Sequence, residues 1–382
     1  MKITDVKTTA MKYPMDYTFS NAVDGPAMLR ARQCLIVEVF TDEGIAGVGE
    51  ADLVGCPPET TMAVIEKELK PLVLGKDPLA VEQLWELMYS ARIMHGRRGL
   101  LMHAISGIDI ALWDIIGKAA GLPLCRLLGC YSDRVPAYAS GGMYKGTDEE
   151  NPDGMNGLQE EIETAVRRGF RAYKMKIGKR RLSIAADMRR VEEARRLLGP
   201  DTPLMVDCNC SWDYARAVKT IPYLEELDVK FIEEPVPVDM VETSARIAAT
   251  TRIPIAGYES ETHLLGFLDL MQRGKVYYLQ PDACRVGGIT ALRKIIALSQ
   301  VYEREICTHA WSSAVSLAAN LHLMATASNA DFLEYDINPN ALREELSVHP
   351  FILEQGNVLL PQRPGLGVEL NPDTVKKYSL KV

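Results

Sequence analysis

The chain has 382 residues, of which 47% are hydrophobic, so it is long enough for two domains or for a barrel with a sizeable appendage, and disorder is excluded. Its formal net charge of −8 argues against a general polyanion-binding role, and no basic run interleaved with aromatic residues could form a nucleic-acid footprint. The N-terminus carries charges where a signal peptide needs an apolar core, and we expect no segment to approach the roughly 18 apolar residues of a membrane span. These features predict a cytoplasmic protein without membrane or nucleic-acid partners, and its eight scattered cysteines are expected to be reduced.

The first 60 residues have the pattern of antiparallel strands with turns. The strand-like runs 33–40 and 45–50 flank the turn at Asp42, Glu43 and Gly44, which predicts a hairpin. Helical periodicity follows at 60–69, 80–90 and 106–120, and Gly121 and Pro123 end the last of these helices. This first block is therefore predicted to be an α+β unit.

Strands and helices alternate from about residue 135 onward. Eight runs have the length and composition of strands: 135–140, 172–177, 203–209, 230–235, 253–259, 276–282, 305–309 and 331–335. Helical patterns such as 158–168, 184–198, 212–227 and 291–303 lie between them, which predicts a parallel sheet. We favour a closed barrel over a doubly wound open sheet, because eight units exceed the usual open-sheet count and polar residues collect at the strand ends, where barrel active sites lie. The tail from about residue 350 has the pattern of turns and short strands.

Three acidic residues, Asp207, Glu233 and Glu259, follow apolar runs at a regular interval of 26 positions. One strand and one helix per interval would bring the three carboxylates to one rim of the barrel. Such a trio is costly unless a divalent cation neutralises it, because neighbouring like charges oppose ionisation. Carboxylate oxygens without sulfur or histidine indicate Mg²⁺, with Mn²⁺ as a substitute, whereas the pair Cys208 and Cys210 is only a weak zinc signal.

Proton-transfer groups are predicted on both sides of this trio. Lys174 and Lys176 are two positions apart on a strand, so both ammonium groups point to the same side. A solvated strand end is the structural alternative, but a neighbouring ammonium and a metal ion would lower the pKa of a lysine and make it a base. Asp282 and His309 end neighbouring runs, and the carboxylate would hold the imidazole in one tautomer, making His309 a general base or acid.

Three further polar residues end strand-like runs. Asn209 is a candidate substrate hydrogen-bonder or, equally, a turn-former. Glu334 could donate a proton to developing negative charge, and Glu234 is expected to face away as a structural partner. A metal ion that binds a substrate carboxylate can stabilise the enediolate that forms when the proton α to that carboxylate is removed. Lysine and histidine on opposite sides of the metal are placed to remove this proton.

In order and spacing, these residues resemble the enolase superfamily and, within it, the mandelate racemase subgroup. The resemblance includes the helix motif at 106–114 and the glycines at 287 and 288, and it covers nearly the whole chain. It implies a capping domain at 1–128, a modified (β/α)₇β barrel at 129–349 and a segment at 350–382 that packs back on the capping domain. It also implies a homo-oligomer and specificity loops at about 16–25 and 54–60.

The same resemblance implies roles for single residues. Asp207, Glu233 and Glu259 would bind Mg²⁺, Lys176 would be one base, Lys174 would contact the carboxylate of a small-molecule substrate, and Asp282 with His309 would form the second base or acid. The segment around Glu259 departs from the family pattern, and Glu261 could join or compete at the metal.

The subgroup contains racemases, sugar acid dehydratases and cycloisomerases, which all start from the same proton abstraction. We expect dehydration of a sugar acid, an aldonate or aldarate, to a 2-keto-3-deoxy acid. Racemisation or epimerisation of a 2-hydroxy acid and cycloisomerisation of an aldarolactone stay open as alternatives. A non-catalytic barrel that keeps the metal as a structural element is the alternative of another class.

Overall fold

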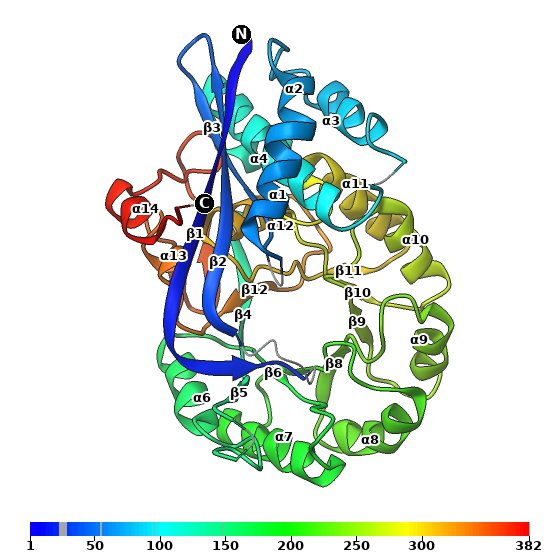
Figure 1. Ribbon diagram of the computed structural model, residues 1–382. Coiled ribbons are helices and arrows are strands. Elements are labelled where there is room, and N and C mark those ends of the chain that lie inside the picture. Colours follow the sequence, from blue (N-terminus) through cyan, green and yellow to red (C-terminus); the bar gives the residue numbers. More distant parts are fainter. Residues whose placement is uncertain (23–28, 54–55, 95, 148, 382) are drawn as a thin grey trace.

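The computed structural model describes residues 1–22, 29–53, 56–94, 96–147 and 149–381. It consists of an N-terminal sheet with helices that packs against a ring of parallel strands, and an outer layer of helices surrounds that ring (Figure 1). The expected specificity loops at 16–25 and 54–60 lie partly outside the described residues, which omit 23–28 and 54–55.

The N-terminal part is an antiparallel sheet covered by helices. Its strands, in the order β3-β2-β1-β5, are β1 (Ile3–Ser20), β2 (Leu29–Thr41), β3 (Ala46–Ala51) and β5 (Tyr144–Lys145). Its helices are α1 (Pro58–Ala63), a π-helical turn (Val64–Leu69), α2 (Lys70–Val73), α3 (Val81–Ser90), α4 (Leu100–Ala120) and α5 (Leu124–Leu128). The expected hairpin is β2 and β3, paired from Leu35 with Ala51 to Phe40 with Ala46.

Helix α4 packs directly on strand β3, and two glycines make this close approach possible. A Cβ atom at Gly49 would lie 2.1 Å from the carbonyl oxygen of Gly107, and one at Gly47 would lie 2.0 Å from that of Ala111. The helix is long and apolar enough to cross a membrane by length and composition alone, so the expectation that no segment approaches a membrane span was wrong. Its apolar window is 83% buried within the protein, which is the environment of a core helix.

The second part is a barrel of eight parallel strands. These are β4 (Arg134–Gly141), β6 (Tyr173–Lys176), β7 (Leu204–Asp207), β8 (Val229–Glu233), β9 (Ile255–Gly257), β10 (Tyr278–Leu279), β11 (Glu305–Ile306) and β12 (Leu333–Asp336). Hydrogen bonding connects them in sequence from β4 to β11, and β12 pairs with β4. Backbone bonds from Ile306 to Asn329 and from Glu334 to Thr308 link β11 to the approach of β12. All eight expected strands are present, and the barrel is confirmed over the open sheet.

Helices connect the strands on the outside of the ring (Figure 1). They are α6 (Leu158–Arg167), α7 (Ile184–Leu198), α8 (Tyr214–Glu226), α9 (Val241–Ala248), α10 (Leu264–Gln272), α11 (Gly288–Val301) and α12 (Ala314–Met324), with a short α13 (Ala341–Glu344) after the last strand. Seven strand-helix units followed by one final strand give the (β/α)₇β arrangement. This arrangement brings the carboxyl ends of all eight strands to one rim.

The C-terminal segment returns to the first sheet. Strands β13 (Leu353–Glu354) and β14 (Asn357–Leu359) form a hairpin that pairs with the start of β4. Helix α14 (Pro372–Tyr378) follows, and the backbone N–H of Leu380 then donates to the carbonyl of Ala10 on β1. The expectation of turns and short strands alone missed α14, which has an Asn371 cap and Pro372 at its first position. The expected domain boundaries after residues 128 and 349 stay a prediction.

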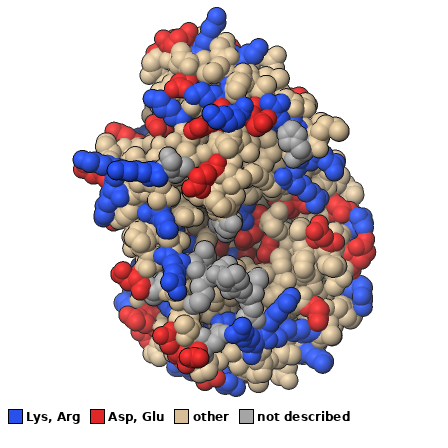
Figure 2. All heavy atoms as spheres, viewed as in Figure 1, with Lys and Arg blue, Asp and Glu red and all other residues tan. Residues whose placement is uncertain are grey.

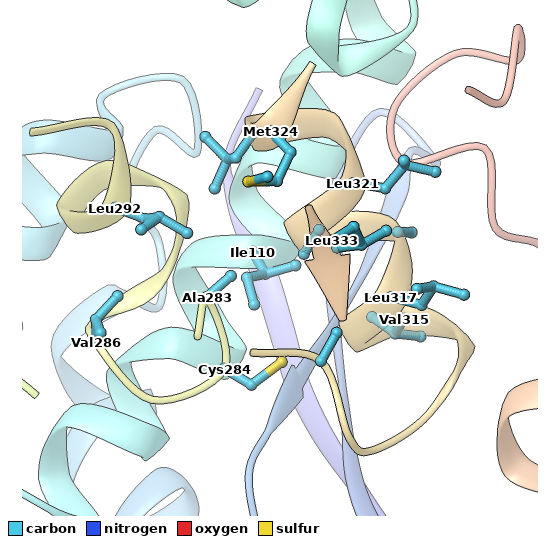
Figure 3. Close-up of a cluster of buried hydrophobic side chains, with 14 of the residues drawn as sticks. Ile110, Ala283, Cys284, Val286, Leu292, Val315, Leu317, Leu321, Met324 and Leu333 are labelled. Carbon is cyan, nitrogen blue, oxygen red and sulfur yellow. The ribbon is translucent and has the colours of Figure 1, made fainter. Parts of the chain in front are cut away.

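A continuous apolar core joins the two parts of the molecule. Figure 3 shows Ile110 of α4 beside Ala283, in the same cluster as Cys284 and Val286, and these last three residues belong to the loop between β10 and α11. All four side chains are fully buried. The loop that follows Asp282 is therefore fixed by packing against the N-terminal part, whereas a separate cluster around Tyr138 and Phe231 fills the barrel interior.

Candidate active site

Strand register alone places three of the predicted site residues side by side. Lys176 on β6 pairs with Asp207 on β7, and Asp207 pairs with Glu233 on β8. All three are the last residues of their strands and are at least nine-tenths buried. Figure 2 shows acidic side chains inside a hollow in the middle of this face of the molecule.

Lys174 lies at the centre of the carboxylates. Its Nζ atom is 2.7 and 2.6 Å from the two oxygens of Glu233, 3.0 Å from Oε1 of Glu334 and 3.7 Å from Oδ2 of Asp207. Burial lowers the pKa of Lys174, but Glu233 and Glu334 outweigh burial and hold the pKa well above its usual value. Its contacts thus favour the charged ammonium form of Lys174.

Lys176 donates from Nζ to Oδ2 of Asp207. Burial lowers the pKa of Lys176 and Lys174 lowers it further, but Asp207, Glu233 and Glu259 together outweigh both effects and leave the pKa above its usual value. Its nearest charges are carboxylates and not the second ammonium. The lowered pKa was expected for a lysine beside a bound metal ion, and for that state it stays a prediction.

Glu259 lies in the loop after β9 and meets cations on both of its oxygens. Its Oε1 is 3.2 Å from NH1 of Arg285, and its Oε2 is 3.3 Å from Nε2 of His309. Burial raises the pKa of Glu259, but His309 and Arg285 outweigh burial and lower it. Glu259 is thus an ionised carboxylate whose side chain is 20% exposed, against 0% for Asp207 and 2% for Glu233.

His309 and Asp282 form the expected dyad. Nδ1 of His309 is 2.7 Å from Oδ2 of Asp282, whose pKa is held low by His309 despite burial. An ionised carboxylate can only accept, so Nδ1 must be the donor, and Nε2 is the nitrogen that faces the site. The second oxygen of Asp282 accepts from the backbone of Cys284 and from Nδ2 of Asn320, which fixes the plane of the carboxylate.

Glu334 completes the ring on the last strand. Its Oε1 accepts from Oγ of Ser140 at 2.6 Å, and its Oε2 lies 3.8 Å from Nε2 of His309. Burial raises the pKa of Glu334, but Lys174 and His309 outweigh burial and bring the pKa well below its usual value. Glu334 is thus a carboxylate in contact with Lys174, and the expected proton donation to developing negative charge stays a prediction.

Asn209 forms a tight turn directly after β7. Its φ angle is +41°, and its backbone N–H donates to Oδ1 of Asp207 at 2.8 Å. Its side-chain Nδ2 also reaches Asp207, while the buried Oδ1 has no hydrogen-bond partner within the described part of the chain. The backbone of Asn209 thus forms a turn, as one of the two interpretations expected. Its Oδ1 could accept a hydrogen bond from substrate, which was the other interpretation.

The two neighbouring glutamates behave differently from each other. Glu261 accepts from the backbone N–H groups of Thr262 and His263 and pairs with Arg98, so it is turned toward the start of α10 and away from the trio. Glu234 is buried, and burial together with Glu259 raises its pKa to about 8. Its oxygens accept from Sγ of Cys210 and from Oγ of Ser260, both at 3.4 Å, and the expectation that it is a structural partner facing away stays a prediction.

The donor set fits a hard divalent cation. Six carboxyl groups share the site with two lysines, one arginine and one histidine, and all but the partly exposed Glu259 are buried. Their metal-binding atoms are all oxygen: Asp207, Glu233, Glu234, Glu259, Asp282 and Glu334. In the regions that the structure describes, no three acidic, histidine or cysteine side chains close around a single point. The carboxylates of Asp207, Glu233 and Glu259 instead contact Lys174, Lys176 and Arg285. A bound ion would share these carboxylate oxygens with the three cationic side chains.

Sequence reasoning missed residues that fix the predicted ones. Gln280 donates from Nε2 to Glu233 at 2.6 Å, Asn320 holds Asp282, and Arg285 holds Glu259. Asp52, from the N-terminal part, accepts from Nε of Arg285. A charged residue at position 285, inside an otherwise apolar stretch, was the available signal for Arg285, while Asn320 lies in a helix and gives none.

This fold and this site define a two-domain barrel protein with a carboxylate-rich centre flanked by lysine and histidine. The sequence matches two family models: the N-terminal domain of mandelate racemase and muconate lactonizing enzyme over residues 10–129, and the enolase C-terminal domain-like model over residues 157–374. The chain therefore belongs to the enolase superfamily, in the mandelate racemase and muconate lactonizing enzyme group, as the resemblance predicted.

Several relatives within this family have named activities. The chain is 35% identical to an arabinonate dehydratase of Saccharolobus solfataricus, with 91% of each chain covered. It is 31% identical to a D-galactarolactone cycloisomerase of Agrobacterium fabrum, over 100% of this chain and 99% of the relative. The crystal structure of an L-talarate/galactarate dehydratase from Salmonella typhimurium, liganded with Mg and L-lyxarohydroxamate, has a TM-score of 0.87 and 29% identity, covering 99% of this chain and 93% of that one.

Proposed function

We propose that this protein removes the proton α to a substrate carboxylate and that the overall reaction is dehydration of a sugar acid, an aldonate or aldarate, to a 2-keto-3-deoxy acid. One observation carries the proposal: Lys176 at the end of β6 and His309 after β11 flank a single group of carboxylates. Two proton-transfer groups on different sides of one anion site suit a reaction that takes a proton from one carbon and delivers a proton to a leaving group.

Each residue of the site has a separate role in the proposed reaction. Lys174, in its ammonium form, donates to the substrate carboxylate, and Oδ1 of Asn209 accepts from a substrate hydroxyl. Lys176 or Nε2 of His309, in its neutral form, takes the C2 proton, and the electron pair of that bond forms the C1–C2 double bond of the enediolate. Asp207, Glu233 and Glu259 would hold Mg²⁺, which would supply positive charge that favours this anion.

The second half of the reaction removes the hydroxyl group at C3. The enediolate electron pair forms the C2–C3 double bond as the C3–O bond breaks, and protonated His309 or its partner gives a proton so that water leaves. The resulting enol takes a proton at C3 and becomes the 2-keto group. Asp282 accepts from Nδ1 throughout and keeps Nε2 as the exchanging nitrogen.

Named relatives support the sugar-acid class. One acts on arabinonate and another on galactarate, and both reactions are dehydrations. Cycloisomerisation of a lactone is the second candidate, since a cycloisomerase aligns over the full chain. Racemisation or epimerisation remains the third, and a racemase from Streptomyces coelicolor with bound magnesium shares the fold. The non-catalytic alternative has no support among these relatives.

The test uses purified protein with Mg²⁺ and a panel of aldonates, aldarates and aldarolactones. Formation of 2-keto acid, followed by the semicarbazide assay, is the expected result, and Lys176→Ala and His309→Ala should each abolish it. If the α-proton exchanges with deuterated solvent but no 2-keto product forms, dehydration is wrong and racemisation becomes the proposed reaction. If the protein consumes an aldarolactone and none of the open-chain acids, cycloisomerisation becomes the proposed reaction.

We further propose a cytoplasmic homo-oligomer that acts on a small-molecule carboxylate without membrane or nucleic-acid partners. The net charge of −8 supports this proposal. We retain the domain boundaries 1–128, 129–349 and 350–382 as part of the same proposal. Size-exclusion chromatography with light scattering tests the oligomer, and limited proteolysis with mass spectrometry tests the boundaries.

A further inference from the structure

Glu259 is the only member of the carboxylate trio that is not the last residue of its strand. Strand β9 ends at Gly257, two residues earlier, whereas Asp207 and Glu233 are fixed by strand pairing. Its side chain is also the most exposed of the three. Something other than the barrel sheet must therefore hold the third carboxylate in place.

Arg285 supplies that support. Its NH1 group contacts both Oε1 and the backbone carbonyl of Glu259, at 3.2 and 3.3 Å. One donor thereby fixes the side chain and the loop that carries it. A guanidinium group is planar and rigid, so the direction of NH1 is set by whatever holds the other end of the group.

Asp52 holds that other end from the N-terminal part of the molecule. Its Oδ2 accepts from Nε of Arg285 at 3.0 Å, and both residues are buried. The backbone N–H of Asp52 also donates to the carbonyl of Cys284, next to Arg285 in the chain. The ion pairs therefore run from Asp52 through Arg285 to Glu259 and cross the boundary between the sheet and the barrel.

The loop that carries Arg285 is anchored at further points. Oγ of Ser106 on α4 accepts from the backbone N–H groups of Gly287 and Gly288, and Asp109 accepts from the backbone and hydroxyl of Thr290. These bonds do not involve Arg285 or Glu259. They anchor the same loop independently and provide an internal control.

We infer that Arg285 is a positioning residue for the third metal carboxylate and that Asp52 sets the metal affinity of the site through it. This inference rests on the proposed function, because it takes Glu259 as a ligand of a divalent cation. Removal of the Asp52 charge would leave Glu259 as the one carboxylate that forms an ion pair with Arg285 among the described residues. The guanidinium would then compete more strongly with the metal for that carboxylate.

Two substitutions separate charge from geometry. Asp52→Asn keeps the shape and an acceptor for Nε but removes the negative charge. Arg285→Lys keeps the positive charge but loses the planar fork that reaches Asp52 and Glu259 together. We expect each to weaken metal binding by about 10- to 100-fold, the range typical of residues that orient metal ligands.

The experiment measures the dissociation constant of Mn²⁺ on the metal-free, full-length protein by electron paramagnetic resonance of free Mn²⁺. Asp109→Asn is the matched control, since it changes a buried carboxyl group that anchors the start of α11, directly after the same loop and away from Arg285, and its constant should stay within about threefold of wild type. Thermal unfolding without metal shows whether each variant is folded, and either Asp52→Asn or Arg285→Lys alone suffices for the test.

Wild-type affinity in both test variants would overturn the inference, as would an equal loss in Asp109→Asn, which would mean that loop anchoring in general sets the affinity. A wild-type protein that binds no Mn²⁺ would overturn it as well. Failure of the proposed reaction is distinguishable, because it appears as normal Mn²⁺ binding and normal sensitivity to Asp52→Asn without turnover of any sugar acid.

Discussion

A buried carboxyl group at the junction of the two parts makes the stability of the protein depend on pH. Glu50, at the inner end of β3, is fully buried and accepts from the backbone of Ser316 at 3.0 Å and from the backbone and hydroxyl of Ser313. Burial outweighs these bonds and raises the pKa of Glu50 from 4.5 to about 7. The folded protein therefore keeps a proton on Glu50 that the unfolded chain releases.

The sign and size of the effect follow from this shift. Since the folded pKa is higher, the contribution of Glu50 to stability is complete below pH 4.5 and is lost as the pH rises to about 7. At about 1.4 kcal/mol per pKa unit, the loss is about 3 kcal/mol. Glu50→Gln carries no titrating proton, so the difference in unfolding free energy between wild type and variant should fall by that amount between pH 4.5 and pH 8.

Urea unfolding of the metal-free protein, followed by tryptophan fluorescence at several pH values, measures this difference. Other titrating groups cancel in the comparison because both proteins contain them. A constant difference across the pH range would refute the reasoning and would mean that the hydrogen bonds from Ser313 and Ser316 keep Glu50 ionised in the folded protein.

Three further changes have defined outcomes. Asp207→Asn should weaken Mg²⁺ binding, measured by calorimetry, by at least about 100-fold, because a directly ligating charge is lost, and unchanged affinity would remove Asp207 from the site. Asn320→Ala should lower turnover by about tenfold with Mn²⁺ affinity unchanged, because Asp282 loses the bond that fixes its plane, and an unchanged turnover number would contradict this role. Gly49→Ala should lower the unfolding free energy by about 1–3 kcal/mol, because the new Cβ would lie 2.1 Å from the Gly107 carbonyl oxygen, and a stable variant would show that α4 can move away from β3.

The positions of Lys176, Asp207 and Glu233 could be predicted because parallel strands with a two-residue side-chain period bring strand ends to one rim. In the structure Lys176 pairs with Asp207 and Asp207 pairs with Glu233, as expected for strand ends at one rim. The same logic extends to Asp282 and His309 after β10 and β11, whose 2.7 Å contact depends only on neighbouring strands.

Contacts made by loops and by separate domains were not predictable in the same way. No spacing rule connects Asp52 with Arg285, which are 233 positions apart, or turns Glu261 toward Arg98 and away from Glu259. The direction of the Lys176 pKa shift in the absence of a metal ion could not be predicted from spacing for a similar reason. The direction depends on which charge is nearest, and Asp207 is in direct contact with Lys176.

The central claim is metal-dependent removal of an α-proton by Lys176 and His309. Proton NMR of sugar acids in deuterated water, with the metal-free protein and after addition of Mg²⁺, tests it most directly. We predict that the C2 proton is lost or exchanged only with Mg²⁺, and that Lys176→Ala and His309→Ala together abolish the reaction while Mn²⁺ still binds. Exchange that proceeds at the wild-type rate in the double variant, or equally well without metal, would contradict the account.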